Sequence, residues 1–112
     1  SPESVIQNSL ISEGCNIEGH IDFSVLFAGV TIEPGAVVRD SIIMPNTTIK
    51  KGAVVEYAIV GEDCVIGENV KVGARPESIE DKDTWGVAGI GDGVTVSDNA
   101  EIKPKAMISA DV

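Results

Sequence analysis

The side chains best suited to chemistry in this chain are a single histidine and two cysteines. His20 could act as a general base, but it has no companions for the three-imidazole zinc site of a hydratase. Cys15 and Cys64 have neither the close spacing of a zinc ribbon nor the second pair of a disulfide framework. These residues therefore predict no catalytic group and no metal site in this chain.

Two further stretches could bind phosphate or another anion. The sequence GIGDG, from Gly89 to Gly93, is glycine-rich, but phosphate loops of this kind open a helix and no helical pattern follows it. Lys50 and Lys51 are adjacent cations, which are most simply a solvated corner. No cofactor is predicted to bind this chain.

The composition excludes several classes of partner. The chain has 112 residues, a formal net charge of −10 and a pI near 4.3, whereas nucleic acids and anionic membranes require clustered Lys and Arg. No apolar run approaches the roughly 20 residues that span a bilayer, and the first residues lack signal-peptide features. We expect a cytoplasmic protein with no nucleic-acid or membrane partner.

Aliphatic residues return every six positions, a period that fits neither a helix nor a simple strand. The first and fifth positions of eleven six-residue units are small or aliphatic, which predicts that both face inward. The first positions are Ile11, Ile17, Leu26, Ile32, Ile43, Ile49, Val60, Ile66, Ile90, Val96 and Ile102, and a truncated unit starts at Ile108. The fifth positions are Cys15, Ile21, Val30, Ala36, Thr47, Ala53, Cys64, Val70, Val94, Ala100 and Ala106.

The fourth position of nine units is Gly, Asn or Asp, the residues that tolerate a positive φ. Pro34, Pro45 and Pro104 come just before it, as in a type II turn. We therefore predict a left-handed turn residue at each fourth position. His20 falls at this position of its unit, and we interpret it as a turn residue as well.

A longer period is superimposed on the six-residue one. Leu26, Ile43 and Val60 are separated by 17 residues, as are Ile32, Ile49 and Ile66. Three units therefore make one circuit, and the stacked circuits would form three parallel sheets around an aliphatic core.

Hexapeptide units of this kind resemble the left-handed parallel β-helix family. The resemblance implies an all-β triangular prism with hexapeptide units in 5–72 and 90–112. The polar segment 73–89 interrupts the count and contains the only Trp, Trp85. This segment could replace a coil or swing out from a corner, either as a surface loop anchored by Trp85 or as an interface or regulatory element.

Three runs resemble the carboxy-terminal domain of bacterial glucose-1-phosphate adenylyltransferase more specifically. They are SVLFAGV (24–30), GAVVRDSIIMP (35–45) and AIVGEDCVIG (58–67), within a match from Asn8 to about Gly73. The alternatives are a hexapeptide-repeat acyltransferase, in which His20 would need to face a subunit boundary, and the non-catalytic homologous subunit of the adenylyltransferase.

The resemblance implies that catalysis belongs to an upstream nucleotidyltransferase domain, which this chain does not contain. In the family that domain binds ATP, glucose 1-phosphate and Mg²⁺, and it makes ADP-glucose and pyrophosphate for glycogen synthesis. This chain lacks the necessary phosphate cradle and metal-holding carboxylates, so we expect it to be non-catalytic alone. It also begins within the repeat, which suggests that its first coil packs on the upstream domain.

For the β-helix itself, the resemblance implies assembly into a homo- or hetero-oligomer, a tetramer in the family. It also implies a contribution to an effector site at the junction with the catalytic domain. Arg39, at a corner, and Arg75, in the interrupting segment, are the candidates for effector or anion binding by charge and position.

Overall fold

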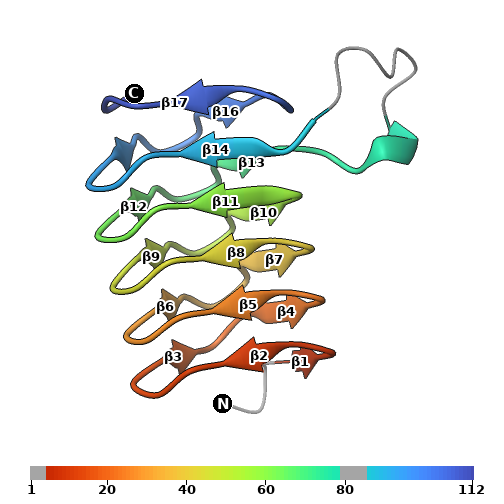
Figure 1. Ribbon diagram of the computed structural model, residues 1–112, viewed down its shortest axis with the longest axis vertical. Coiled ribbons are helices and arrows are strands. Elements are labelled where there is room, and N and C mark those ends of the chain that lie inside the picture. The colour runs from red at the N-terminus through yellow and green to blue at the C-terminus, as the bar shows by residue number, and fades with distance from the viewer. Residues whose placement is uncertain (1–4, 79–85) are drawn as a thin grey trace.

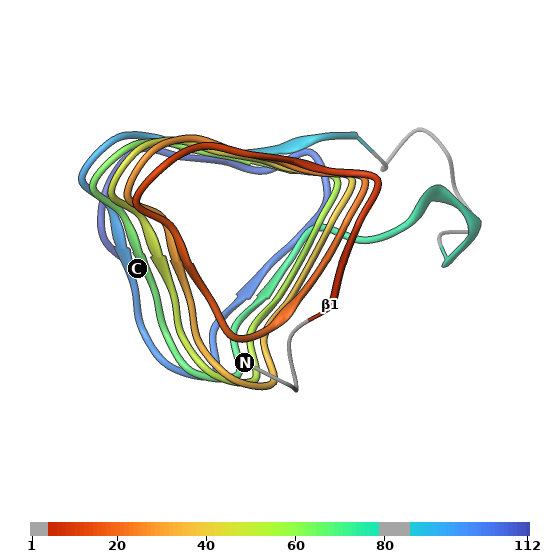
Figure 2. The same cartoon turned by 90° about the horizontal axis from the view of Figure 1, so that it is seen from below.

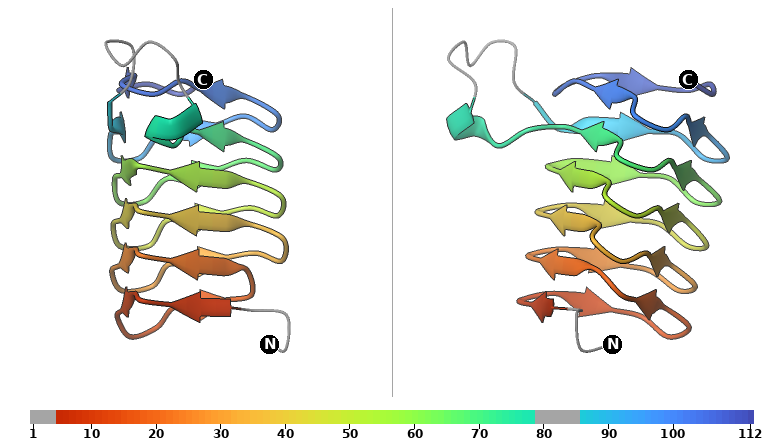
Figure 3. Two further views of the ribbon diagram at one scale, coloured as in Figure 1. Left: turned by 90° about the vertical axis from the view of Figure 1, so that its right-hand side faces the viewer. Right: turned by 180° about the vertical axis from the view of Figure 1, so that it is seen from behind.

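The computed structural model describes residues 5–78 and 86–112, which form a solenoid of short strands (Figure 1). Viewed along the stack, each coil is triangular and runs counter-clockwise as the chain recedes, so the solenoid is left-handed (Figure 2). The strands of successive coils lie directly above one another on each side (Figure 3). The predicted left-handed parallel β-helix is confirmed.

Three parallel sheets form the sides of the prism, and we name them by their outward residues. The charged face consists of β1 (Val5–Gln7), β4 (His20–Asp22), β7 (Val37–Arg39), β10 (Val54–Glu56), β13 (Lys71–Val72) and β16 (Glu101–Ile102). The apolar face consists of β2 (Leu10–Ile11), β5 (Val25–Leu26), β8 (Ile42–Ile43), β11 (Ala58–Val60), β14 (Ala88–Ile90) and β17 (Met107–Ile108). The threonine face consists of β3 (Asn16–Ile17), β6 (Thr31–Ile32), β9 (Thr48–Ile49), β12 (Val65–Ile66) and β15 (Thr95–Val96).

The core is a set of aliphatic columns, as the 17-residue period predicts. Leu26 pairs with Ile43 and Ile43 with Val60, and all three side chains are fully buried. The first-position residues from Leu26 to Ile102 are buried, whereas Ile11, Ile17 and Ile108 in the outermost coils are partly exposed. Strand pairing thus places identical positions above one another, and the aliphatic side chains fill the shaft between the three sheets.

The predicted turn residues are confirmed at all nine Gly, Asn and Asp positions. Their φ angles lie between 56° and 79°, and Lys105 adopts the same conformation at 71°. These residues are Gly14, Gly29, Gly35, Asn46, Gly52, Asp63, Asn69, Gly93 and Asn99.

The interpretation of His20 as a turn residue is wrong. His20 lies in β4, where it pairs with Val37, and it is not among the positive-φ residues. The corner before it is shorter than the others, because Ile17 pairs with Ile32, 15 positions on, while Ile21 pairs with Val38, 17 positions on. Gly19 permits this tight corner, since an added Cβ would lie 2.5 Å from the Ala36 carbonyl oxygen.

The interrupting segment swings out from a corner and does not replace a coil. It leaves after β13 and returns at β14, which pairs directly with β11. Val60 pairs with Ile90, 30 positions on, where Ile43 pairs with Val60 at the usual 17. The segment begins with one 3-10 turn, η1 (Pro76–Ser78), and its predicted anchor Trp85 lies outside the described residues.

Candidate functional site at the loop corner

The candidate site lies where the charged face meets the apolar face, at the corner from which the loop departs (Figure 1). Each of four successive coils turns here through one residue with a φ of 48° to 50°, in the order Asn8, Phe23, Asp40 and Tyr57. Two of them are aromatic, and such residues rarely adopt this conformation. The surrounding hydrogen bonds must therefore hold the corner in place.

Those hydrogen bonds form a ladder of serine hydroxyl groups. The Ser24 and Ser41 amides donate to the hydroxyl oxygens of Ser9 and Ser24, one coil below, at 3.0 and 3.2 Å. The Ala58 amide donates to Ser41 Oγ at 3.2 Å. Each hydroxyl in turn donates to the carbonyl two residues earlier in its own chain segment. The ladder ends at Ala58, and the next strand instead bonds through the Ala88 amide to the Tyr57 carbonyl at 3.1 Å.

Beside the ladder, one carboxylate joins the two arginines that the sequence analysis singled out. Arg39 Nη1 donates to Glu56 Oε2 at 3.1 Å, and Arg75 Nε donates to the same oxygen at 3.0 Å. The Glu56 side chain is only 11% exposed, whereas the arginine side chains are 33% and 49% exposed. A nearly buried carboxylate therefore aligns two partly exposed guanidinium groups.

Local backbone geometry brings Arg75 to this place. Gly73 has a φ of 71°, and an added Cβ would collide with the Glu56 carbonyl oxygen. A glycine is thus required for the chain to leave β13 close above Glu56. Two residues later Arg75 reaches back to the Glu56 side chain and ties the start of the loop to the corner.

The charge of the corner is mixed. Asp22 precedes Arg39 in the same column, and its Oδ1 is buried without a hydrogen-bond partner among the residues that the structure describes. Burial and then the neighbouring carboxylates of Asp40 and Glu77 raise the pKa of Tyr57, against the opposing effect of Arg75. An anion would therefore have to compete with Glu56 for the guanidinium groups while acidic residues stand nearby.

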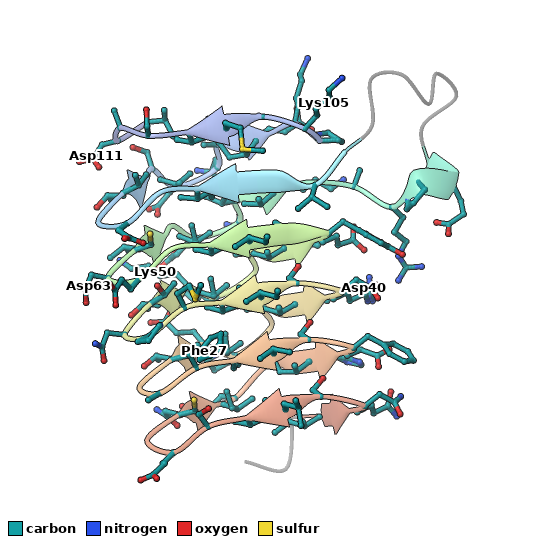
Figure 4. All side chains as sticks on the ribbon, viewed as in Figure 1. Phe27, Asp40, Lys50, Asp63, Lys105 and Asp111 are labelled. Atoms are coloured by element: carbon teal, nitrogen blue, oxygen red, sulfur yellow. The ribbon has the colours of Figure 1, made fainter. Side chains whose placement is uncertain are left out.

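Sequence reasoning found both arginines but missed Glu56, which holds them together. The sequence did contain a signal for the Arg39–Glu56 contact, because Glu56 follows Arg39 by one 17-residue circuit and pairs with it directly. The other charged candidates lie elsewhere: Lys50 is on the side of the prism away from Asp40 (Figure 4).

The cysteines occupy the inward positions that the repeat predicts. Cys64 is 1% exposed and its thiol donates to the Gly91 carbonyl at 3.0 Å. Burial raises the pKa of the Cys64 thiol, which disfavours the reactive thiolate. Cys15 packs partly buried against the core.

Neither a metal site nor a membrane span is found in residues 5–78 and 86–112. No three His, Cys, Asp or Glu side chains gather there in a way that could hold a metal ion. The same residues contain no helix with the length and apolar character needed to cross a membrane.

The stacked hexapeptide coils define the chain as a left-handed β-helix of the hexapeptide-repeat class. Residues 1–97 match the family model described as GlmU-like, C-terminal hexapeptide, and the chain belongs to that family. The resemblance to glucose-1-phosphate adenylyltransferases is also confirmed. Enzymes of that name from Bacillus thuringiensis (strain Al Hakam), Bacillus mycoides (strain KBAB4) and Bacillus anthracis are each 49% identical over 72 residues.

These alignments cover 64% of the chain but only 19% of each relative, so the chain spans a small part of their length. Among solved structures, the acetyltransferase domain of PglB from Neisseria gonorrhoeae FA1090 is similar, with a TM-score of 0.71 and 21% identity. The alignment covers 99% of this chain and 48% of that domain. Its complex with acetyl coenzyme A also gives a TM-score of 0.71, at 20% identity over 91% of this chain and 49% of that one. At such identities the likeness shows the fold alone.

Proposed function

We propose that this chain is the assembly and regulatory domain of a cytoplasmic glucose-1-phosphate adenylyltransferase. The observation that carries the proposal is the 49% identity to enzymes of that name over 72 residues of the chain. The parent enzyme would make ADP-glucose and pyrophosphate from ATP and glucose 1-phosphate for glycogen synthesis. ATP and Mg²⁺ would bind its upstream nucleotidyltransferase domain.

In this proposal the β-helix is non-catalytic alone. Nucleotidyl transfer needs carboxylates that hold a metal ion and donors that surround the phosphates. Glu56, the carboxylate between the two arginines, is already engaged by both of them, and its burial leaves little room for a metal ion. The domain would contribute by packing on the catalytic domain and by joining subunits into an oligomer, a tetramer in the family.

The test of the enzyme assignment is an assay of the full-length protein that contains this chain. With ATP, glucose 1-phosphate and Mg²⁺ it should release pyrophosphate, while the 112-residue chain alone should not. A full-length protein without this activity would contradict the proposed parent enzyme, and activity in the isolated chain would contradict its non-catalytic role.

We further propose that Arg39 and Arg75 bind an anionic effector of that enzyme. Their guanidinium groups are partly exposed and are held on one carboxylate, so an anion that displaced Glu56 would meet two aligned donors. Arg39→Ala and Arg75→Ala should each raise the effector concentration for half-maximal response by roughly 10-fold, as expected when a charge-assisted hydrogen bond of about 1.5 kcal/mol is lost.

The matched control is Lys50→Ala, which removes a cation on another side of the prism (Figure 4). This variant should respond to the effector like the wild type. An equal loss of response in all three variants would indicate a general charge effect, and an unchanged response in both arginine variants would exclude the site.

A further inference from the structure

The apolar face carries two columns of outward residues, and none of its twelve positions is charged. The first column, in strand order, is Leu10, Val25, Ile42, Ile59, Gly89 and Met107. The second column lies two positions further along the chain and is Ser12, Phe27, Met44, Gly61, Gly91 and Ser109. Both other faces carry charged residues outward, so this face is distinct in a chain whose net charge is −10.

The bulk of these side chains is distributed unequally along the stack. The second and third coils carry large residues, and Phe27, which directly follows β5, is exposed (Figure 4). The fourth and fifth coils carry Gly61, Gly89 and Gly91 in the same columns. Gly61 is buried beneath the fifth coil, whereas Gly89 and Gly91 line a hollow of about 460 Å³ between Ile59 and Met107. One half of the face is therefore raised and the other half is hollowed.

We propose that the apolar face binds a second copy of this chain, with the two β-helices antiparallel. A two-fold axis parallel to the strands, between β8 and β11, would reverse the coil order and keep each column opposite itself. In the second column Phe27 would then face Gly91 of the other copy, and Met44 would lie opposite the coil that contains the buried Gly61. In the first column Val25 would face Gly89, and Ile42 would face Ile59. Both glycines that line the hollow, Gly89 and Gly91, are thereby placed opposite an apolar side chain.

A parallel arrangement does not give this fit. A two-fold axis along the stack would keep each coil opposite its own copy and exchange the two columns, so that Phe27 would meet Val25 and Gly91 would meet Gly89. The raised halves would then hold the hollowed halves apart and leave apolar surface exposed to water. Complementary packing therefore favours the antiparallel pair.

The charge distribution favours the same face for self-association. Two copies with a net charge of −10 each repel one another. The electrostatic cost of contact is lowest at a face without charged side chains, because no charged group there has to be desolvated. The six strands, about 4.8 Å apart, give a face about 24 Å tall. Two columns of side chains on a face of this height offer less area than the about 800 Å² per partner that a standard stable interface buries. We therefore expect a weak, concentration-dependent dimer.

The first experiment measures the dimer by sedimentation equilibrium of the 112-residue chain over micromolar to millimolar concentrations. Gly91→Met should raise the dissociation constant at least about 10-fold, because it fills the hollow that receives Phe27. The substitution suits the fold, since Gly91 does not have a positive φ and an added Cβ would lie 3.4 Å from its nearest neighbour. The matched control Thr95→Met adds the same side chain to the threonine face and should dimerise like the wild type.

Phe27→Lys removes the opposite partner of the same contact and should weaken the dimer by a similar factor. It serves as the second variant if Gly91→Met lowers the melting temperature. A chain that stays monomeric at millimolar concentration, or a dimer that neither variant weakens, would overturn the proposal.

The second experiment tests the orientation with Leu10→Cys and Met107→Cys in one chain. These side chains are strongly exposed, at 71% and 74%, and they lie on the first and last strands of the face. Because five strand spacings separate them by about 24 Å, a disulfide between positions 10 and 107 can only join two copies. Peptide mapping of the oxidised dimer should show the 10–107 bond. Bonds that join only 10 to 10 and 107 to 107, or no bond at all, would exclude the antiparallel dimer. The result does not depend on the proposed enzyme activity.

Discussion

At the scale of single residues, two properties of each hexapeptide decide the structure. The inward positions must be small or aliphatic, and the residue at the corner must accept a positive φ. Gly52 illustrates the second property, because its φ is 74° and an added Cβ would collide with the Asn69 side chain of the next coil. Its neighbour Lys51 is exposed and makes its contact to Glu33 through the backbone amide.

We predict that Gly52→Val destabilises the chain by roughly 1–3 kcal/mol, because a β-branched residue is strained at positive φ. Lys51→Ala, one position away, should change the free energy of unfolding by less than about 0.5 kcal/mol. Chemical denaturation of both variants checks the prediction. Equal midpoints would contradict the role of the fourth position in the turn.

A charged substitution tests whether the fifth position of each unit faces inward. Ala53 is fully buried at the fifth position of its unit. Ala53→Glu would place a carboxylate in the aliphatic shaft without a partner, and we expect that it prevents folding. Circular dichroism of the purified variant gives the answer, and a native spectrum with a cooperative melt would be incompatible with an inward side chain.

Burial of the Cys64 thiol also predicts a pH dependence. Its pKa is raised in the folded state, so the unfolded chain loses the thiol proton first as the pH rises. The contribution of Cys64 to stability is therefore complete below the pKa of an unfolded cysteine and decreases above it. The free energy of unfolding should fall between about pH 8 and pH 10. Cys64→Ala should show a smaller fall over this range in parallel denaturation curves, whereas an unchanged slope would show that other groups cause it.

At the scale of elements, the corners differ more than the strands. The short strands repeat the same inward pattern, while the loop corner relies on the serine ladder and on Glu56. Ser41 is central to that ladder, because its Oγ accepts from the Ala58 amide and donates to the Arg39 carbonyl at 2.7 Å. Ser9 occupies the outermost coil and is less buried.

We predict that Ser41→Ala costs about 1–3 kcal/mol, because it leaves the Ala58 amide without its acceptor inside the corner. Ser9→Ala removes the same kind of bond nearer the solvent and should cost less, because water can replace the hydroxyl. The two free energies of unfolding, measured in urea, provide the comparison. A larger loss in Ser9→Ala would contradict the importance of burial in the ladder.

The sequence predicted these elements unevenly, for physical reasons. Residues such as Leu26, Ile43 and Val60 repeat at 17, so their stacking could be read directly. The short corner at Gly19 was missed because Ile21 is inward in either register, and burial alone does not distinguish them. Likewise, the ion pairs of Glu56 depend on the path of the loop that follows Gly73, which the repeat does not encode.

At the scale of the whole molecule, the β-helix is a stack in which each coil contacts only its neighbours. Its contacts are correspondingly regular, and a middle coil is covered on both sides while an outermost coil is covered on one. Ile17 and Ile49 occupy the same column of the threonine face, yet Ile49 is fully buried and Ile17 is only partly buried. Stability should therefore vary along the stack as a sum of neighbouring interfaces.

This additivity predicts different costs for one substitution at two places in the stack. Ile49→Ala should destabilise the chain by about 2–5 kcal/mol, because it opens a cavity between two covering coils. Ile17→Ala should cost less, since its side chain already meets solvent and the outermost coil can separate from the rest. Hydrogen exchange should show the same order, with the slowest amides in β6, β9 and β12 and faster exchange in β3. Uniform protection across these strands would mean that the solenoid unfolds as one cooperative unit, in which case each substitution would lower protection by the same amount in every strand.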